Sequence, residues 1–453
     1  MVDIEKIMMN NLWNTFNILR GYFEIEVSQK IIRELLFVKL LNDEIEKDNK
    51  YFIERIDGTL KFQDYLELPE RFIDELYMFI KKNECLNGLV DEIFRIRGKL
   101  ESRLISDLLK IFVSFKNNSE MKSHTLFKYF IDSTATNSKS SGEISTPASI
   151  CKLISKLLED KSIKSLYDPA IGTGSLVLEV ASKHNDVKLY GQDKNLSVLN
   201  TCKMLLILDE KIEDLENVYH GDTILEPGNT IDDNLVKFDC IVCNPPYGLR
   251  EWGYNQVLDC DKYNRFKRGM PSRHVGDYAF ITHVLESLND SGVAVMIEPA
   301  GVLFREGAEG KLREQFVREN LIDCIIALPS NMMYGTTIPV NIIVFNKNKK
   351  TNDILFMDIA QEVSVNKQLT TISDESINRV TDIYRDKDDV EGLARVVSIS
   401  EIENNNFNLM PQRYIESKCE REYLDIGSLN SDIKSLVKKL NNIQSELVEI
   451  LSK

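Results

Sequence analysis

The segment Asp168–Ser175, with the sequence DPAIGTGS, decides the fold predicted for this chain. It follows the β-rich run Ser165–Tyr167 and precedes the apolar helical segment Leu176–Ala181. Glycines at a strand-to-helix turn let the backbone approach a ligand closely and point helix N–H groups at it. Dinucleotide sites and plain tight turns both use such a turn, and the GKS or GKT continuation of a P-loop is missing here. The turn predicts an α/β ligand site, and other residues must identify the ligand.

Short β-rich runs alternate with helical segments on both sides of this turn. The candidate strands are Ser165–Tyr167, Lys188–Gly191, Asn217–Tyr219, Phe238–Cys243, Val293–Glu298, Ile322–Leu328 and Val340–Phe345. Helical segments separate most of them, which predicts a doubly wound, largely parallel sheet.

Two acids stand at the ends of the second and third candidate strands. Asp193 lies 25 residues after Asp168, a spacing that suits a receptor for ribose hydroxyls. Asp222, within HGDT, can accept a hydrogen bond from an adenine amino group. Each acid alone is also typical of a helix N-cap or a turn. Together, at the carboxyl ends of successive strands, they outline the crevice where open α/β sheets bind ligands.

The fourth candidate strand ends directly in NPPY, residues 244–247. An amino group on adenine is a poor nucleophile because its lone pair is delocalised into the ring. The Asn244 side-chain oxygen and the Pro245 carbonyl can accept both amino hydrogens, and Pro245 and Pro246 make the loop rigid. Tyr247 offers a face on which a flipped base can stack. These catalytic residues predict in-line methyl transfer from a sulfonium to an amino group, whereas a plain Pro-rich turn would need neither the strand nor the glycine turn.

The length and composition limit the class of protein. At 453 residues the chain is expected to form two or three folding units, and its 43% hydrophobic residues are typical of a globular protein. Its apolar runs are shorter than the roughly 20 residues that span a bilayer, and its start lacks a signal-peptide layout. A cytoplasmic location without membrane contact is expected.

The eight cysteines are scattered, which suits a reducing compartment. Cys240 and Cys243 have CxxC spacing, but a second pair or nearby histidine that would complete a zinc site is missing from the sequence around them. We interpret them as small apolar residues of a buried strand and predict no metal.

The net charge of −15 opposes binding to phosphates, so a local basic patch or a partner should supply affinity for DNA. Residues 248–274 interleave basic and aromatic residues and contain few acids. A solvated loop is the alternative. The candidate DNA contacts are Arg250, Lys262, Arg265, Lys267, Arg268 and Arg273.

The two ends of the chain differ from its centre. Residues 1–140 are predicted to form a helical domain, with dense apolar positions in Val27–Ile45 and Leu86–Phe115 and a polar linker at Asp132–Ser141. Residues 141–415 are predicted to form the sheet domain. Residues 416–453 are predicted to form a partner-docking helix, because apolar residues alternate four and three apart. This heptad seam consists of Leu429, Ile433, Leu436, Leu440, Ile443, Leu447 and Ile450.

The order of glycine turn, acid, Gly-Asp and NPPY resembles the amino-group methyltransferases with the Rossmann-like fold. Over nearly its full length the chain resembles the modification subunits of type I restriction-modification systems, an N6-adenine DNA methyltransferase family. The segments that carry this resemblance are LW (12–13), LRG (19–21), FVKLL (37–41), GEISTP (142–147), DYAF (277–280), PAGVLF (299–304), LP (328–329), YGTTIP (334–339) and FNLMPQRY (407–414). The glycine turn departs from the family's frequent Cys-Gly-Ser-Gly, but Gly172 and Gly174 are retained.

The resemblance implies an α/β fold, a class I methyltransferase domain with a mostly parallel seven-stranded sheet, and S-adenosylmethionine as cofactor. Thr146 is predicted to N-cap a helix that begins at Pro147, and the family places this turn at the methionine end of the cofactor. Tyr334 takes the position of a second aromatic against the flipped adenine, beside Tyr247. The expected cofactor-binding residues are Thr146, Pro147, Asp168, Gly172, Thr173, Gly174, Ser175, Asp193, Asp222, Thr223 and Asn244.

The resemblance also implies partners: double-stranded DNA, one sequence-specificity subunit for two copies of this chain, and nuclease subunits for restriction. Two alternatives remain. A methyltransferase of RNA or of a protein glutamine amide could use the same NPPY loop but would not be expected to carry the N-terminal helices or the terminal heptads. A catalytically silent DNA-binding scaffold would not need the intact Asp168, Gly172, Gly174, Asn244 and Tyr247.

Overall fold

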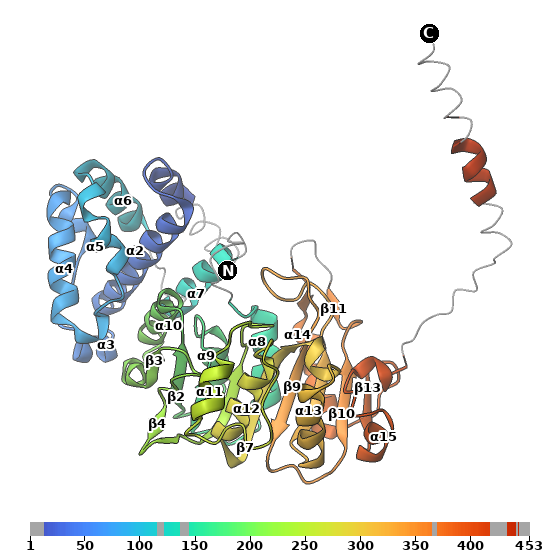
Figure 1. Ribbon diagram of the computed structural model, residues 1–453. Coiled ribbons are helices and arrows are strands. Elements are labelled where there is room, and N and C mark those ends of the chain that lie inside the picture. Colours follow the sequence, from blue (N-terminus) through green and yellow to red (C-terminus); the bar gives the residue numbers. More distant parts are fainter. Residues whose placement is uncertain are drawn as a thin grey trace. The chain divides into compact units, whose positions relative to one another are not determined.

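The computed structural model describes residues 13–115, 122–135, 145–364, 369–416, 433–440 and 443 (Figure 1). Contacts group the chain into two compact units, Met1–Ile415 and Glu416–Lys453. Among the described residues, no helix combines the length and the apolar surface that crossing a membrane requires. Leu12, residues 142–144 and the predicted boundary at 140/141 lie outside the described residues.

The first part of the larger unit is helical, as the sequence predicts. After a helical segment at 13–19 come α2 (Ile25–Glu46), α3 (Lys50–Arg55), α4 (Phe72–Lys82), α5 (Asp91–Arg95), α6 (Ser102–Ser114) and α7 (Ser123–Ala135). Short 3-10 turns occur here and farther along the chain at Phe62–Tyr65, Pro69–Arg71, Glu84–Leu86, Arg97–Lys99, Ile212–Asn217, Ala300–Leu303 and Pro411–Arg413.

The helical spacing of Leu86–Phe115 does not produce one continuous helix. Only α5 and α6 are helical within it, separated by the 3-10 turn Arg97–Lys99. Gly88 has a positive φ of 77°, which a helix interior does not allow. The apolar spacing continues across the break because both helices bury one face in the same core.

The second part of this unit contains a nine-stranded sheet with the order β13-β10-β8-β9-β7-β6-β1-β2-β3 (Figure 1). Its strands are β1 (Ser165–Asp168), β2 (Lys188–Asp193), β3 (Val218–His220), β6 (Phe238–Cys243), β7 (Leu288–Pro299), β8 (Ile322–Ala327), β9 (Val340–Asn346), β10 (Ile354–Asp358) and β13 (Ala394–Val397). β9 runs antiparallel to β7 and β8, β13 runs antiparallel to β10, and the other neighbours are parallel. Two small antiparallel ribbons lie outside the sheet, β4 (Thr230–Ile231) with β5 (Asn234–Leu235) and β11 (Val363–Ser364) with β12 (Thr371–Ile372).

The sequence predicts seven of these strands, which are neighbours in the sheet in the order β8-β9-β7-β6-β1-β2-β3. The mostly parallel α/β fold is therefore confirmed. β10 and β13 extend the sheet beyond β8 and were not predicted from the sequence. β13 forms the sheet edge, where a strand buries fewer side chains and leaves a weaker apolar pattern. β10 is an internal strand with the apolar run Ile354–Met357.

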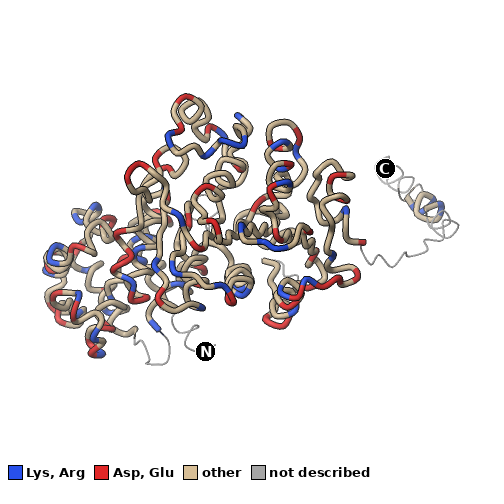
Figure 2. Tube along the Cα trace, turned by 90° about the horizontal axis from the view of Figure 1, so that it is seen from below, with Lys and Arg blue, Asp and Glu red and all other residues tan. Residues whose placement is uncertain are grey.

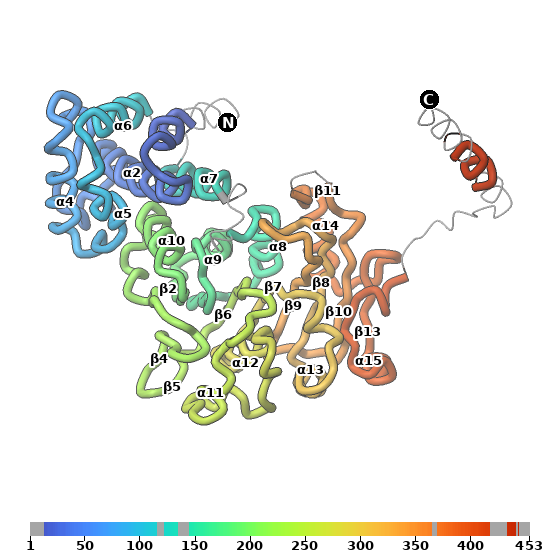
Figure 3. The backbone as a smooth tube through the Cα atoms, turned by 45° about the horizontal axis from the view of Figure 1, so that its top comes forward, coloured from blue at the N-terminus to red at the C-terminus, as the bar shows by residue number. Residues whose placement is uncertain are grey.

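Alternating side chains of the strands build a core on each face of the sheet. Val242 and Val295 belong to one core, and their neighbours Ile241 and Met296 belong to the other. The first core is covered by α8 (Ala148–Leu158), α9 (Ser175–Ala181), α10 (Leu196–Leu208) and α14 (Asp374–Asp386). The second is covered by α11 (Tyr254–Cys260), α12 (Asp277–Ser287), α13 (Ala308–Arg318) and α15 (Ile399–Asn404). Figure 3 shows the two groups of helices on opposite sides of the sheet.

Cys240 and Cys243 are buried on β6, as the sequence interpretation requires. Cys240 faces the first core and Cys243 the second. The two thiols therefore point to opposite faces of the sheet and act as small apolar side chains.

The N-terminal helices lie against the first face, where α2 and α7 contact α10 (Figure 3). Polar bonds cross this contact: the Arg33 guanidinium donates to Ser197 Oγ at 3.2 Å, and the Tyr51 hydroxyl donates to Glu213 at 2.7 Å. The helical part and the sheet part share one continuous apolar core.

The smaller unit is described at Glu416 and at residues 433–440 and 443, and the last two stretches are helical. Ile433, Leu436, Leu440 and Ile443 are all more than half exposed, and the other described residues there are exposed as well, so the heptad seam stays a prediction. Leu429, Leu447 and Ile450 lie outside the described residues.

Candidate active site

A cavity of about 1000 Å³ lies at the carboxyl edge of the sheet, where β1, β2, β3 and β6 end. Parallel strands bring their carboxyl ends to one edge, so four segments that are distant in the sequence meet there. The cavity is lined by Pro169, Ala170, Gly172, Asp193, Lys194, Asn195, Leu196, Val198, His220, Gly221, Asp222, Thr223, Asn244, Pro245, Pro246, Tyr247, Leu249, Phe280, Met333, Tyr334, Thr336 and Ile338.

The glycine turn after β1 has the backbone shape that only glycine adopts easily. Gly172 and Gly174 have φ values of 56° and 80°. A Cβ atom on Gly174 would lie 2.7 Å from Cys202 Sγ, so this position also leaves no room for a side chain. Gly172 borders the cavity, and its N–H donates to Asp193 Oδ2 at 2.9 Å.

Several predicted cofactor contacts support the turn instead of lining the cavity. Asp168 is buried and accepts from the Ala170 N–H at 2.9 Å. Burial raises the pKa of Asp168 to about 8, while that N–H partly opposes the rise. The hydroxyls of Thr173 and Ser175 lie 3.1 Å apart, and Ser145 Oγ donates to Ser175 Oγ at 3.2 Å. Because they are buried and bonded to one another, these side chains fix the conformation of the turn.

The two predicted acids at the strand ends do line the cavity. Asp193 Oδ1 accepts from the Asn195 N–H at 2.8 Å, and Asp222 Oδ1 accepts from the Ile224 N–H at 3.0 Å. Asp222 Oδ2 also pairs with Lys194 Nζ at 3.0 Å. Both acids therefore act as turn residues and as cavity residues at once, which the sequence had left as alternatives.

The loop after β6 holds Asn244 from both ends of its amide. Asn244 Nδ2 donates to Thr146 Oγ1 at 3.1 Å, and the Tyr247 hydroxyl donates to Asn244 Oδ1 at 2.6 Å. Burial raises the pKa of Tyr247, so its hydroxyl keeps the proton that it donates. The amide orientation is thus set by two bonds, and the second lone pair of Oδ1 stays available.

The predicted role of Thr146 as a helix cap is wrong. α8 begins at Ala148, one residue later than expected, with Pro147 at the N-cap and no side-chain capping bond. Thr146 Oγ1 instead accepts from Asn244. Pro147 lacks an N–H, and its ring disfavours a helical conformation of Thr146, which suits a residue outside the helix.

Tyr334 lies on the wall formed by residues 333–338 and lines the same cavity as Tyr247. Burial raises its pKa to about 12. The structure therefore brings the two predicted aromatics to one cavity. The apolar lining residues Leu196, Leu249 and Met333 were not predicted from the sequence. Phe280 and Ile338 do fall inside quoted motifs, DYAF and YGTTIP.

The basic stretch after the catalytic loop divides into exposed and paired residues. Arg250 and Arg273 are exposed and line a second opening of about 860 Å³, where the Arg273 guanidinium lies 6.0 Å from the centre of the Tyr254 ring. Lys262 pairs with Asp233 at 2.7 Å, and Lys267 pairs with Glu286 at 2.8 Å. Figure 2 shows basic and acidic positions intermixed along the trace, so any basic surface is local.

Two arginines of this stretch differ from the expectation of DNA contact. Arg268 pairs with both Glu286 and Glu319, and 11% of its side chain is exposed. Arg265 is buried, with 1% of its side chain exposed, so its predicted role as a DNA contact is wrong. Basic composition alone could not distinguish a guanidinium that enters the core from one that faces solvent.

A buried acidic cluster lies behind the catalytic loop. The Gly248 N–H donates to Asp277 Oδ1 at 2.7 Å, and Asp277 also binds Arg305. Glu298, near the end of β7, is fully buried, and neither of its carboxyl oxygens has a hydrogen-bond partner among the described residues. Burial, followed by the nearby Asp277 carboxylate, raises the pKa of Glu298 well above its ordinary value.

Replacing Glu298 with glutamine is expected to stabilise the protein increasingly as the pH rises. The carboxyl has a raised pKa in the folded state, so its stabilising protonated form is fully present below about pH 4.3 and is lost as the pH rises through the folded pKa. Between about pH 4.3 and the folded-state pKa, one pH unit changes the difference in unfolding free energy between variant and wild type by about 1.4 kcal/mol. Chemical denaturation between pH 5 and pH 9 measures this difference.

Glu286→Gln is the matched control, for which the expected effect on stability at neutral pH has the opposite sign. Burial opposes the ionisation of Glu286, but hydrogen bonds from Lys267 and Arg268 bring its pKa below the ordinary value. The ionised Glu286 carboxylate stabilises the folded protein above that ordinary pKa, and this stabilisation is lost as the pH falls. Glu286→Gln should therefore have a lower free energy of unfolding than the wild type at neutral pH. A pH-independent effect of Glu298→Gln would contradict the buried neutral carboxyl.

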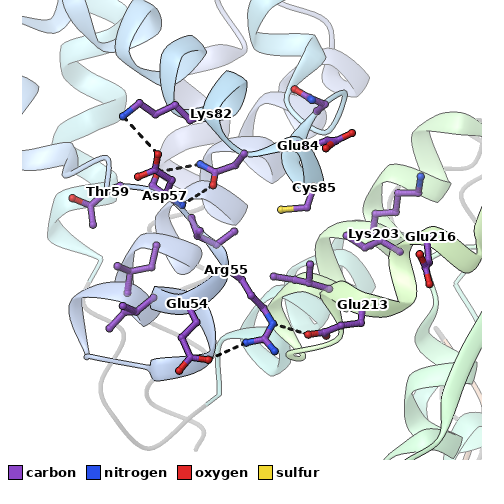
Figure 4. A pocket seen from close by; sticks show the side chains of 18 residues that line it. Glu54, Arg55, Asp57, Thr59, Lys82, Glu84, Cys85, Lys203, Glu213 and Glu216 are labelled. Carbon is purple, nitrogen blue, oxygen red and sulfur yellow. Dashed lines mark hydrogen bonds and ion pairs between the residues drawn. The ribbon is translucent and has the colours of Figure 1, made fainter.

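A larger opening of about 1200 Å³ lies between the N-terminal helices and the α10 side of the sheet (Figure 4). Its charged side chains pair with one another across the opening: Arg55 Nε lies 2.6 Å from Glu213 Oε1. Its lining residues include neither the glycine turn nor the loop after β6. The cavity at the carboxyl edge is therefore the candidate active site.

Known proteins resemble this chain in sequence and in fold. The model of the family described as N-6 DNA Methylase matches residues 123–423. The methylase subunit of the type I restriction enzyme MpnII from Mycoplasma pneumoniae is 30% identical over 352 residues, which cover 74% of this chain and 65% of that protein. A type I restriction-modification methyltransferase subunit from Streptococcus thermophilus has a similar fold, with a TM-score of 0.80 at 24% identity over 91% of this chain and 100% of that chain. A Listeria monocytogenes protein described as a class I S-adenosylmethionine-dependent methyltransferase matches with a TM-score of 0.52 at 15% identity, over 85% of this chain and 98% of that one.

Proposed function

This chain belongs to the N-6 DNA methylase family, and from that membership we propose that it is the modification subunit of a type I-like restriction-modification system. It transfers a methyl group from S-adenosylmethionine to the N6 amino group of a flipped adenine in DNA. The expected family, fold class and reaction agree with the family match and with the related fold.

The cavity residues fit the cofactor. Gly172 has the left-handed backbone that allows close approach of a ligand, and Asp193 and Asp222 present carboxylates at the strand ends. Asp193 suits the ribose hydroxyls, and Asp222 suits an adenine amino group. Leu196 and Val198 add apolar surface to the same cavity. When bound, the cofactor supplies an electrophilic methyl group on a sulfonium.

The loop after β6 activates and orients the target amino group. Asn244 Oδ1 and the Pro245 carbonyl accept its two hydrogens, which favours a pyramidal nitrogen with a free lone pair. Tyr247 and Tyr334 stack on the flipped base. Thr146 and Tyr247 hold the Asn244 amide before the substrate arrives, so little reorganisation is needed.

One observation carries this proposal: Asn244, held at both ends of its amide, lines the same cavity as the glycine turn and the two strand-end acids. The remaining predicted residues of the turn, Asp168, Thr173, Gly174 and Ser175, contribute by shaping it. Thr223 contributes through its hydroxyl, which donates to the Pro169 carbonyl at 2.6 Å. Pro147 contributes by keeping Thr146, which binds Asn244, outside the helix.

The DNA strand beside the flipped base contacts the groove lined by Arg250 and Arg273. Neither guanidinium takes part in an ion pair with a described residue, whereas Lys262 and Lys267 are exposed but already paired. Unpaired exposed cations bind phosphates without first breaking another pair. Tyr254 adds a ring face in the same groove.

Replacing both Arg250 and Arg273 with alanine is expected to weaken DNA binding at every sequence. The slope of log affinity against log salt should decrease in magnitude by about 2, because two phosphate contacts are lost. Fluorescence anisotropy with a labelled duplex at several salt concentrations measures the slope. Arg318→Ala is the control, since Arg318 ends α13 shortly before the start of β8, away from the carboxyl ends of the strands. An equal effect of this variant would argue against the groove.

The choice of DNA sequence belongs to a partner chain. Two copies of this protein bind one sequence-specificity subunit through the C-terminal residues 416–453, and a restriction subunit can join them. The helical domain at 1–140 and the methyltransferase domain at 141–415 form the body of each copy. Support comes from the net charge of −15 and from the exposed apolar positions Ile433, Leu436 and Leu440.

Transfer of a labelled methyl group to adenine-containing duplexes, with and without the product of the neighbouring gene, tests the proposal. Label recovered as N6-methyladenine supports it. Label in RNA or in a protein glutamine would favour the alternative methyltransferases. Failure to bind S-adenosylmethionine would favour a silent scaffold.

A further inference from the structure

Arg265 is the most extensively bonded cation of the stretch after the catalytic loop. Its Nε donates to Asp261 Oδ1 at 2.9 Å, and its backbone N–H donates to the other oxygen of the same carboxylate at 2.6 Å. Its Nη2 donates to the Ile224 carbonyl at 2.7 Å, and its Nη1 donates to the Thr223 carbonyl at 3.3 Å. The loop residue is thus bonded to the segment that follows β3.

That segment forms one wall of the cofactor cavity. Thr223 lines the cavity, and its hydroxyl donates to the Pro169 carbonyl at the start of the glycine turn. The N–H of Ile224 donates to the carboxylate of Asp222, the acid expected to meet the cofactor's adenine. Arg265 therefore binds the carbonyls of Thr223 and Ile224. The Thr223 hydroxyl contacts the glycine turn, and the Ile224 N–H orients Asp222.

A second contact leads from Arg265 to β1. His283 Nδ1 lies 3.4 Å from Arg265 Nη1, and His283 Nε2 lies 3.2 Å from the Tyr167 hydroxyl. Burial, then the charge of Arg265, lowers the pKa of His283 well below its ordinary value, so the ring is neutral. A guanidinium only donates, so Nδ1 accepts and Nε2 carries the proton toward Tyr167. Tyr167 immediately precedes Asp168, the first residue of the glycine turn.

We propose that Arg265, in the loop between α11 and α12, is a positioning residue that shapes the cofactor cavity. Its guanidinium reaches Thr223, Ile224 and His283 at once, and Asp261 fixes the direction of that fork. The proposal rests on the proposed function, and it assigns to Arg265 a role toward the cofactor instead of the DNA.

The geometry requires arginine and not merely a positive charge. A lysine ammonium is a compact point charge and cannot reach Asp261, two carbonyls and an imidazole with a planar fork. In Arg265→Lys, the Thr223 and Ile224 carbonyls lose their buried donor, so the wall beside Asp222 loses its support. The affinity for S-adenosylmethionine should then fall by about tenfold, the effect of losing charged hydrogen bonds.

Arg313→Lys provides a matched control for this substitution. Arg313 is also buried, and its guanidinium also donates to carbonyls, those of Phe407 at 2.7 Å and Arg305 at 2.8 Å. These residues do not line the cavity. Both substitutions should lower the thermal unfolding midpoint, but only Arg265→Lys should weaken cofactor binding.

The experiment is isothermal titration of the full chain with S-adenosylmethionine, together with DNA binding by anisotropy. Arg265→Lys should raise the cofactor Kd about tenfold and leave DNA affinity within about twofold. Asp261→Asn, a milder change outside the cavity, should shift the cofactor Kd in the same direction if Arg265→Lys does not fold. An unchanged cofactor Kd in both variants, or an equal loss in Arg313→Lys, would overturn the proposal. A wild-type chain that binds no cofactor would instead overturn the proposed function.

Discussion

Replacing Asn244 with alanine is expected to lower methyl transfer by roughly 10²–10³-fold, the usual effect of removing one preorganised group that acts on the reacting atoms. Alanine removes the Oδ1 acceptor of the target amino hydrogen and leaves the Tyr247 hydroxyl and Thr146 Oγ1 without their shared partner. The glycine turn and the strand-end acids do not depend on this side chain, so S-adenosylmethionine should bind nearly as before. Single-turnover methylation and cofactor titration measure the two effects separately.

Asn244→Asp is the matched control because aspartate keeps the shape and an oxygen that can accept from Tyr247. It replaces the Nδ2 donor to Thr146 with a second oxygen and adds a negative charge, but it keeps an acceptor for the target amino hydrogen, so its methylation rate should lie between those of the wild type and the alanine variant. Wild-type transfer by Asn244→Ala would rule out the mechanism. A loss of cofactor binding in step with the rate would assign Asn244 to the cofactor alone.

Replacing Tyr247 with alanine is expected to lower the specificity constant for DNA by about 10–100-fold, because stacking of a base on an aromatic ring contributes about 1–3 kcal/mol. The same change removes the hydroxyl that holds Asn244 Oδ1 at 2.6 Å. Tyr334 remains in the same cavity and retains part of the stacking surface. Steady-state methylation over a range of duplex concentrations measures the effect.

Tyr247→Phe separates the two roles of this residue. The ring is kept and the hydroxyl is lost, so KM for DNA should stay near the wild-type value while the maximal rate falls as Asn244 becomes less constrained. If the phenylalanine variant were as impaired as the alanine variant in KM, then the hydroxyl and not the ring would bind the base.

The sequence was informative wherever a function depends on a local pattern. Strand-helix alternation identified seven strands, and strands such as β8 and β9 are nearly continuous apolar runs because they are buried on both faces. The NPPY loop was recognisable because two prolines and an amide after a strand form a rigid unit. The two strand-end acids were identified because each ends a candidate strand, at the edge where open α/β sheets bind ligands.

Roles that depend on distant contacts could not be predicted from the sequence. Thr146 and Asn244 are 98 positions apart, so the local preference of threonine for a helix cap was the stronger signal. Arg265 resembles its basic neighbours in the sequence, and only the position of Thr223 and Ile224 shows why it is buried. Apolar cavity residues such as Leu249 give no signal, because an apolar side chain looks the same in a core and in a binding wall.

The antiparallel insertion of β9 between β7 and β8 has a consequence for synthesis on the ribosome. β8 has β9 and β10 as its sheet neighbours, and both are translated after it, β9 starting at Val340, 13 residues beyond Ala327. β1, β2, β3, β6 and β7 can pair earlier, while the buried apolar residues of β8 must wait for a partner. A chain whose synthesis ends between 328 and 339 and that is released from the ribosome would therefore expose an unpaired apolar strand, the kind of intermediate that chaperones bind.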